Sequence, residues 1–205
     1  MKLELYDFSN RMRRFAKKCC LILVFFVTGS YAQIVNIPDP VFKAKLLAAN
    51  TNNSIAMNAA GNWMKIDINN DSQIQLSEAL LVRELNVNLA DIANVPGITS
   101  FANLRLLLCD RNLLTSLDLT GMANLEYVDC YMNEITSVNL TGLTNLEYFD
   151  CSYNELTNLN LTGLPNLNFL WCADNYLTSL DLSAVPNLET LYFGQNQISN
   201  FDLSG

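Results

Sequence analysis

The stretch LEYVDCYMNEITSVNLTGLTNLEYFDCSYNELTNLNLTGLPN, residues 125–166, decides the fold because its second half repeats its first half after 21 residues. The same spacing continues on both sides of it, with the skeleton LxxLxCxxNxLTxLxLxGLxN. A degenerate unit opens at Val82, and a truncated one closes the chain. The period predicts an array of about five to six stacked units over residues 82–205. Three columns carry it: Leu104, Leu125, Leu146, Leu167 and Leu188; Cys109, Cys130, Cys151 and Cys172; Asn112, Asn133, Asn154, Asn175 and Asn196.

The residue types explain why such units stack. Val128 and Cys130 alternate with polar positions, which predicts a short strand with these two side chains pointing inward. Asn133 follows at the turn, where its amide can satisfy backbone groups that would otherwise be buried without partners. Ile135 and Val138 begin a second apolar wall. Since one unit cannot cover its own core and stacked units can, the sequence predicts a strand-rich solenoid with a parallel sheet and little helix.

Composition excludes several classes of function. The chain contains no histidine, which excludes His-based triads, His general bases and His-containing zinc sites. Residues 33–205 carry six basic and eighteen acidic side chains, and no Lys or Arg follows Arg111. We therefore expect no nucleic-acid partner, because few cations remain to meet phosphates.

Residues 1–32 predict a secretory signal peptide. Basic residues from Arg11 to Lys18 precede a short apolar run over residues 19–27, and small residues follow at Ser30 and Ala32. The expected cleavage lies between Ala32 and Gln33. The alternative is a membrane anchor, but the apolar stretch is shorter than the roughly 20 residues that span a bilayer. The mature protein is expected to be secreted or on the cell surface, without a transmembrane anchor.

The repeat skeleton resembles the leucine-rich repeat, LxxLxLxxNxL, with cysteine in place of the third leucine. This resemblance implies an α/β-class solenoid with a curved parallel sheet and a small helical N-terminal cap. Short units behind a signal peptide are similar to secreted bacterial proteins of the internalin type. The segments NLxxLxC and LTxLDL are similar to repeats common in cell-surface proteins of Bacteroidetes-like bacteria. The resemblance implies surface recognition or adhesion.

The repeat cysteines allow two interpretations. In an oxidising compartment they could form disulfides. The next member of their column is Phe193, however, and a residue that exchanges with Phe fills space. We therefore predict buried free thiols, which behave as small hydrophobic groups.

Residues 33–81 are expected to form the N-terminal cap of the array. Asp39 followed by Pro40 predicts a helix start, with Asp39 as the N-cap. The helix is expected to end within residues 50–54. Its predicted apolar face consists of Val41, Phe42, Leu46 and Leu47.

The cap also contains DINNDSQIQLSE, residues 67–78, which resembles an EF-hand or dockerin-type calcium loop. Ser72 stands where that family prefers Gly, so one weak, structural Ca²⁺ site is the prediction. The alternative is a polar turn before a helix. The resemblance assigns the ligands to Asp67, Asn69, Asp71, the carbonyl of Gln73 and Glu78, with Gln75 acting through water.

Outward positions of the predicted strands and the turns after them carry rings mixed with acids. Such a face on a rigid scaffold is typical of a partner site. The alternative is that the rings only stabilise the sheet. The predicted ligand-binding residues are Tyr127, Asp129, Tyr131, Tyr148, Asp150, Tyr153, Phe169, Trp171 and Tyr192.

The sequence therefore predicts a non-catalytic adhesion module that binds a protein or glycan on a cell surface. The second hypothesis is a repeat spacer of a longer surface protein. A glycan-active enzyme is a remote third, because Asp129 and Asp150 form a carboxylate pair but nothing else supports catalysis. The chain stops at Gly205 inside an unfinished unit, so we expect further chain, a frayed end or self-association there.

Overall fold

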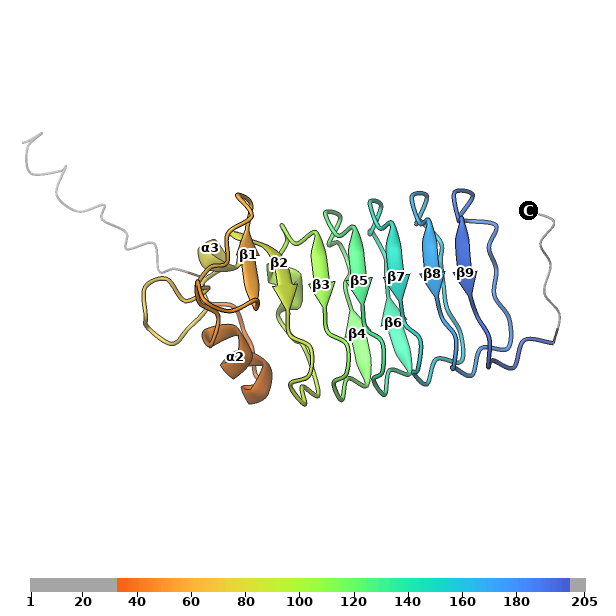
Figure 1. Cartoon of the computed structure of the whole chain (residues 1–205), viewed down its shortest axis with the longest axis horizontal. Coiled ribbons are helices and arrows are strands. Elements are labelled where there is room, and N and C mark those ends of the chain that lie inside the picture. The colour runs from red at the N-terminus through yellow and green to blue at the C-terminus, as the bar shows by residue number, and fades with distance from the viewer. Residues whose placement is uncertain (1–32, 200–205) are drawn as a thin grey trace, which may run out of the picture. The chain divides into compact units, whose positions relative to one another are not determined.

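The computed structural model describes residues 33–199, which form a solenoid of stacked coils with one parallel sheet along its length (Figure 1). The signal-peptide prediction falls on residues 1–32, outside the described residues, and the predicted open end falls on residues 200–205, likewise outside them. Among the described helices, none has the length and apolarity that crossing a membrane requires. The main strands, in chain order, are β2 (Val82–Asn86), β3 (Leu106–Leu108), β5 (Tyr127–Asp129), β7 (Tyr148–Asp150), β8 (Phe169–Trp171) and β9 (Thr190–Tyr192).

The sheet keeps the 21-residue register that the sequence predicts. Tyr127 pairs with Tyr148, and Asp129 pairs with Asp150, so equivalent residues of successive units lie side by side. The exception is the degenerate first unit, where Glu84 pairs with Leu106, 22 residues later. Because strand side chains alternate between the two faces, each column of the repeat keeps one environment through the stack.

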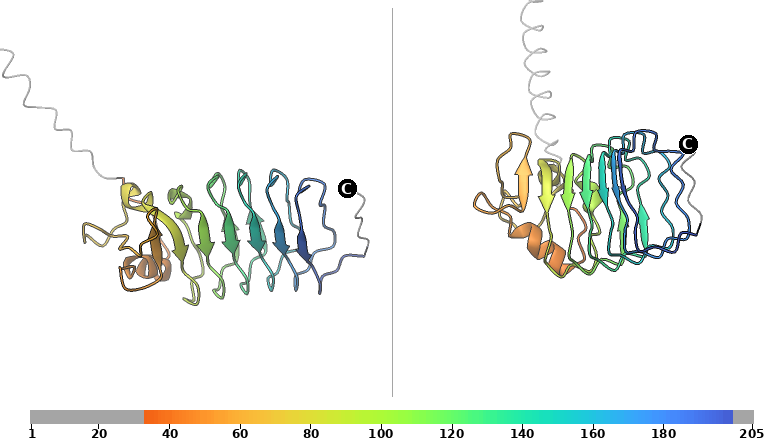
Figure 2. Two further views of the ribbon diagram at one scale, coloured as in Figure 1. Left: turned by 45° about the horizontal axis from the view of Figure 1, so that its top comes forward. Right: turned by 45° about the vertical axis from the view of Figure 1, so that its right-hand side comes forward.

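A second wall closes each coil. It contains β4 (Ser116–Asp118) and β6 (Ser137–Asn139), which pair in parallel as a separate two-stranded sheet. Figure 2 shows the coils stacked behind one another, with the main strands on one side of the stack. The core fills the space between them, and Val128, Phe149 and Leu170 of the main sheet are fully buried in it. The predicted strand-rich solenoid with little helix is confirmed.

The asparagine column, called here the ladder asparagines (Asn112, Asn133, Asn154, Asn175 and Asn196), supplies the polar contacts of the core. The Asn154 side-chain nitrogen donates to the carbonyls of Cys130 and Cys151, at 3.0 and 3.1 Å. Its Oδ1 accepts from the backbone N–H of Ile135 at 2.9 Å. Each ladder asparagine thus binds its own unit and the preceding one, and among the described residues every buried side-chain nitrogen and oxygen has a partner. These bonds satisfy backbone groups that the hydrogen bonds between strands do not reach.

The four repeat cysteines are free and buried between the walls, as predicted. Burial raises the pKa of the Cys172 thiol to about 12, and it raises the pKa of Cys109, Cys130 and Cys151 as well. A neutral thiol in this column acts as a small apolar group. The Sγ of Cys130 also lies 3.2 Å from the carbonyl oxygen of Asp150.

The cap begins with α2 (Pro40–Leu47), and Asp39 caps it as predicted: its Oδ1 accepts from the N–H of Val41 and Phe42 at 2.9 and 2.8 Å. Phe42 and Leu46 are fully buried, but Val41 is 41% exposed, so its assignment to the apolar face is wrong. Val41 lies about 100° around the helix from Phe42, on the solvent side.

The rest of the cap covers the first repeat. A strand that the sequence analysis did not anticipate, β1 (Ala56–Asn58), pairs antiparallel with β2 and extends the sheet by one strand. A short helix, α3 (Leu76–Ala79), precedes β2, and a 3₁₀ turn, η1 (Ile98–Ser100), lies in the first unit. The cap thereby pairs one edge of the main sheet, which would otherwise present open hydrogen-bonding groups.

Candidate functional site

The predicted ring and acid residues gather on the outward face of the main sheet, called here the strand face. Seven of them stand on strands: Tyr127 and Asp129 on β5, Tyr148 and Asp150 on β7, Phe169 and Trp171 on β8, and Tyr192 on β9. Tyr131 and Tyr153 lie in the turns that follow β5 and β7. The in-register pairing brings residues of one column next to each other, so that residues 65 positions apart belong to a single surface.

Ring contacts connect these side chains across the strands. Tyr127 and Tyr148 stack face to face, with ring centroids 4.1 Å apart. Tyr148 also lies near Phe169 and Trp171, with centroids 6.3 and 5.7 Å away. Trp171 meets Tyr192 edge to face at 5.3 Å. Such contacts stabilise neighbouring strands.

A pocket of about 310 Å³ opens on the strand face where the rings separate. Tyr131 and Tyr153, in edge contact at 5.2 Å, belong to its lining, and so do Trp171 and Tyr192. The carboxylate of Asp150 also lines it, although this residue is only 4% exposed. The pocket therefore combines aromatic surfaces with a buried acid. Its lining consists of Tyr131, Asp150, Ser152, Tyr153, Trp171, Ala173 and Tyr192.

The acids of the strand face are held in a poorly solvated environment. Burial raises the pKa of Asp129 to about 6, with smaller contributions in the same direction from the negative charges of Asp110 and Asp150. Burial also raises the pKa of Asp150, although its Oδ1 accepts from the N–H of Ser152 at 2.8 Å. Arg111 opposes the shift at Asp129, and its guanidinium lies 5.8 Å from the centre of the Tyr131 ring.

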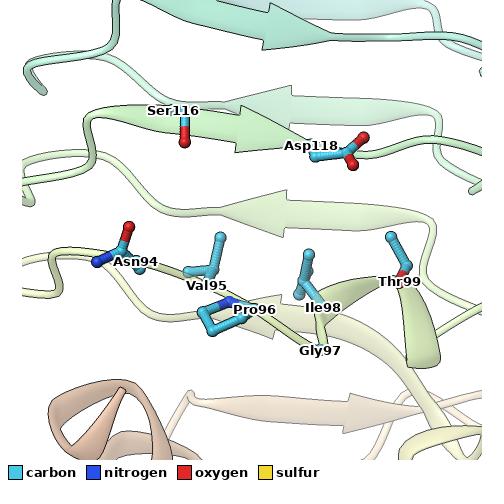
Figure 3. Close-up of a pocket in the computed structure, with 8 residues that line it drawn as sticks. All are labelled: Asn94, Val95, Pro96, Gly97, Ile98, Thr99, Ser116 and Asp118. Carbon is cyan, nitrogen blue, oxygen red and sulfur yellow. The ribbon is translucent and has the colours of Figure 1, made fainter. Parts of the chain in front are cut away.

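A second depression, of about 290 Å³, lies away from the strand face and is shown in Figure 3. It separates residues 94–99 of the first unit from Ser116 and Asp118 of β4. Asp118 is its one acid, and its carboxylate accepts hydrogen bonds from the backbone and hydroxyl of Thr120. With no ring and no buried charge in its lining, this depression offers less to a ligand than the pocket on the strand face.

The predicted calcium loop forms a compact turn. Asp67 Oδ1 accepts from the N–H of Asp71 at 3.1 Å, and Asp71 Oδ1 accepts from that of Gln73 at 2.8 Å. Ser72 has φ of 64°, the left-handed backbone for which the resembled family uses Gly. Glu78 accepts from the N–H of Ile68 at 2.8 Å.

The donors of this loop suit calcium by type, because they are carboxylate and amide oxygens. Their present arrangement uses them for hydrogen bonds within the loop, including one from the side chain of Asn69 to Asp71. Within residues 33–199, no group of three or more acidic, cysteine or histidine side chains is arranged to hold a metal ion. Calcium binding thus requires these side chains to turn toward a common centre, and it stays a prediction.

Residues 144–184 and 165–205 each match the family described as leucine-rich repeats in two copies. The match covers fewer than half of the residues of the chain, so leucine-rich repeats are what this part of the chain is similar to. Among curated proteins, none matches the chain.

Several solved structures are similar to this chain at low sequence identity. The leucine-rich-repeat domain of a Shigella effector is 24% identical with a TM-score of 0.50, over 63% of this chain and 66% of that one. Internalin C2 from Listeria monocytogenes is 22% identical with a TM-score of 0.39, over 84% and 91%. The functional domain of InlJ from Listeria monocytogenes, described as including a cysteine ladder, is 20% identical with a TM-score of 0.30, over 83% and 49%. This chain thus spans about two thirds or less of the Shigella and InlJ chains, and the Shigella likeness supports the fold alone.

The pocket itself was not predicted from the sequence, although one signal for it was present. The position after the cysteine column in successive 21-residue units is occupied by Tyr131, Ser152, Ala173 and Gly194. Side-chain volume falls along this column while Tyr153, Trp171 and Tyr192 stand around it. Small residues between large rings leave a hollow, so a decrease in size along a column could have indicated the pocket.

Proposed function

We propose that the chain is a secreted or cell-surface protein-binding module that recognises its partner through the strand face. The observation that carries the proposal is the exposure of large rings there: Tyr153 is 49% exposed and Tyr192 is 58% exposed. Contiguous exposed rings of this kind are typical of partner sites. Aromatic side chains give large contact areas at low entropic cost, and they dominate binding energy at protein interfaces.

Stabilisation of the sheet accounts for only some of the aromatic side chains on the strand face. The stacked pair Tyr127 and Tyr148 fits that role, because each ring covers the other at 4.1 Å. Tyr192 leaves most of its surface in solvent. A ring that is mostly exposed contributes little to the core and retains most of its area for a partner.

The proposal is tested by screening the chain against arrays of surface proteins and glycans. The double variant Trp171→Ala, Tyr148→Ala should lose the binding that the wild type shows, because it removes the centre of the ring network. Tyr176→Ala is the matched control, since Tyr176 is 51% exposed but lies outside the strand face. It should bind as the wild type does.

Two results would contradict the proposal. Equal binding by the double variant and the wild type would place the partner site elsewhere. Absence of binding by every variant would favour the repeat spacer. If a glycan binds and no protein does, the strand face remains the binding site, but the partner is a glycan.

We also propose that the loop of residues 67–78 binds one Ca²⁺ weakly and that the ion rigidifies the cap. The oxygen donors of Asp67, Asn69, Asp71 and Glu78 and the left-handed Ser72 support it. Isothermal calorimetry and thermal melting with millimolar CaCl₂ should show heat and a raised melting temperature, and Asp67→Asn should remove both. If neither signal appears in the wild type, the loop is a polar turn.

A further inference from the structure

The pocket on the strand face has the composition of a cation-binding cage. Tyr131, Tyr153, Trp171 and Tyr192 contribute rings to its lining. The faces of aromatic rings carry partial negative charge and attract ammonium and guanidinium groups within about 6 Å. The carboxylate of Asp150 adds a full negative charge when ionised, and it lies in the same pocket at 4% exposure.

Within residues 33–199, no basic side chain forms an ion pair with Asp150. One backbone hydrogen bond, from the N–H of Ser152, reaches its Oδ1. Burial and the negative charge of Asp110 raise its pKa, hydrogen bonds from the backbone and side chain of Ser152 lower it, and no basic residue contributes. No Lys or Arg occurs after Arg111, so the units that surround this acid on its C-terminal side contain none. A buried acid without a cation favours a ligand that brings one.

One unit earlier, the chain supplies its own cation to the equivalent acid. Arg111 lies over Tyr131 at 5.8 Å and lowers the pKa of Asp129. The residue 21 positions after Arg111 is Met132, and the residue 21 positions after Asp129 is Asp150. Asp129 therefore has both a ring and a cation of the chain nearby. At Asp150, the position equivalent to Arg111 is held by Met132, so that cation is missing.

The charge of the chain favours the same kind of ligand. Residues 33–205 hold six basic and eighteen acidic side chains. A negative protein attracts a basic partner surface over long range, which raises the rate of association. The pocket volume of about 310 Å³ is enough for a single side chain.

We infer that this pocket binds the cationic side chain of a partner protein, an arginine guanidinium or a lysine ammonium held between the rings against Asp150. The inference rests on the proposed function and names the chemistry of the partner group. The rings contact the faces of the cation and its aliphatic stem, while the carboxylate bonds its N–H groups.

Fluorescence of Trp171 provides a direct assay. The chain has two tryptophans, so Trp63→Phe leaves Trp171 as the single reporter in the pocket. The probes are N-acetyl-arginine amide and N-acetyl-lysine amide, each compared with its neutral counterpart, the citrulline and norleucine derivatives. At least one cationic probe should change the Trp171 emission with an affinity about tenfold or more above that of its neutral counterpart, a difference of about 1.4 kcal/mol. Equal affinities for both members of each pair would overturn the inference.

Two variants test the charge of Asp150 and the open volume of the pocket separately. Asp150→Asn keeps an oxygen for the Ser152 N–H and removes the charge, so the cationic probe should bind at least about tenfold more weakly. Ala173→Phe fills the pocket and should abolish binding while leaving Asp150 in place. Asp181→Asn, which changes an exposed acid outside the pocket, should bind as the wild type does. Unchanged affinity in both pocket variants would sink the inference, and the neutral-probe comparison decides the matter if either variant fails to fold.

Failure here is distinguishable from failure of the proposed function. A protein partner that binds Asp150→Asn as tightly as the wild type, but not the Trp171→Ala, Tyr148→Ala variant, supports the strand face and contradicts the cation cage. Probe binding without any protein partner supports the cage and contradicts the module.

Discussion

At the scale of single residues, the ladder asparagines stabilise the turn after each main strand through hydrogen bonds. Asn154 is 7% exposed and makes contacts with two successive units. An apolar side chain there leaves carbonyls and an N–H group buried without partners, which is costly.

Asn154→Ala should lower the free energy of unfolding by about 3 kcal/mol, since several buried groups lose partners at roughly 1–3 kcal/mol each. Urea denaturation followed by circular dichroism measures it. Asn166→Ala is the control in the same unit, because Asn166 is exposed and donates one bond, to the carbonyl of Thr144 at 2.9 Å. It should cost less than about 1 kcal/mol, and an equal loss in both variants would contradict the ladder account.

The residue before each ladder asparagine carries local strain. Met132 has φ of 58°, a left-handed backbone that is unfavourable for this residue type, and its side chain is 49% exposed. Asn accepts this conformation more readily than Met.

Met132→Asn should therefore raise the free energy of unfolding by about 0.5–1 kcal/mol. Thermal melting checks the direction. Glu134→Asn, on the other side of the ladder asparagine and outside the left-handed positions, should give no gain. A melting temperature lowered by Met132→Asn would mean that the Met side chain makes contacts that matter more than the strain.

At the scale of elements, the pairing of β5 with β7 places two acids next to each other in a dry environment. The folded state binds a proton at Asp129 more tightly than the unfolded state, because burial raises its pKa from 3.8 to about 6. Stability from this group is therefore fully present below about pH 4 and lost as the pH rises through about 6.

Asp129→Asn removes that loss. At about pH 7.5 the variant should be more stable than the wild type by roughly 1 kcal/mol after discounting for solvent screening, and at about pH 4 the two should be equal. Urea denaturation at both pH values gives the comparison. Asp181→Asn should show no gain at neutral pH, because hydrogen bonds from Ser183 lower the pKa of Asp181. A gain for Asp129→Asn that does not depend on pH would point to a cause other than charge.

The elements that the sequence predicts well are those governed by the 21-residue period. Residues such as Tyr127 and Tyr148 pair because equal spacing and equal side chains leave one register that buries every column. The cap has no period to follow. Its strand β1 forms from the polar stretch around Ala56 because the edge of β2 is available, a tertiary cause that local sequence does not contain.

The sequence predicted where the strand face lies, but it did not predict the burial of Asp150 or the pocket. Strand alternation identifies Asp150 and Trp171 as outward residues, and the structure places both there. Alternation does not show that Asp150 is nearly buried. The pocket depends on Ser152 and Ala173 being small, a property of cross-unit packing.

The whole molecule is an array in which each unit contacts its neighbours, so its length should be adjustable in whole units. Deleting residues 125–145 joins equivalent positions of adjacent units and keeps every column aligned. The shortened chain should retain its circular dichroism spectrum and show a smaller urea m-value, in proportion to the lost surface.

Deleting residues 125–144, one residue fewer, is the matched control. It displaces each later side chain along its coil and moves polar groups into the core, so the chain should unfold or aggregate. Equal stability of the two deletions would show that the period does not control the stack.

The ladder asparagines all reach in one direction along the solenoid. Asn196 donates to the carbonyl of Cys172, and Asn175 donates to that of Cys151, each in the preceding unit. Under tension along the axis, each coil would have to break the same set of bonds to its neighbour, so coils would detach one at a time. Each release would add 21 residues, about 70 Å of extended chain, so the protein would yield under load in equal increments and not in one rupture.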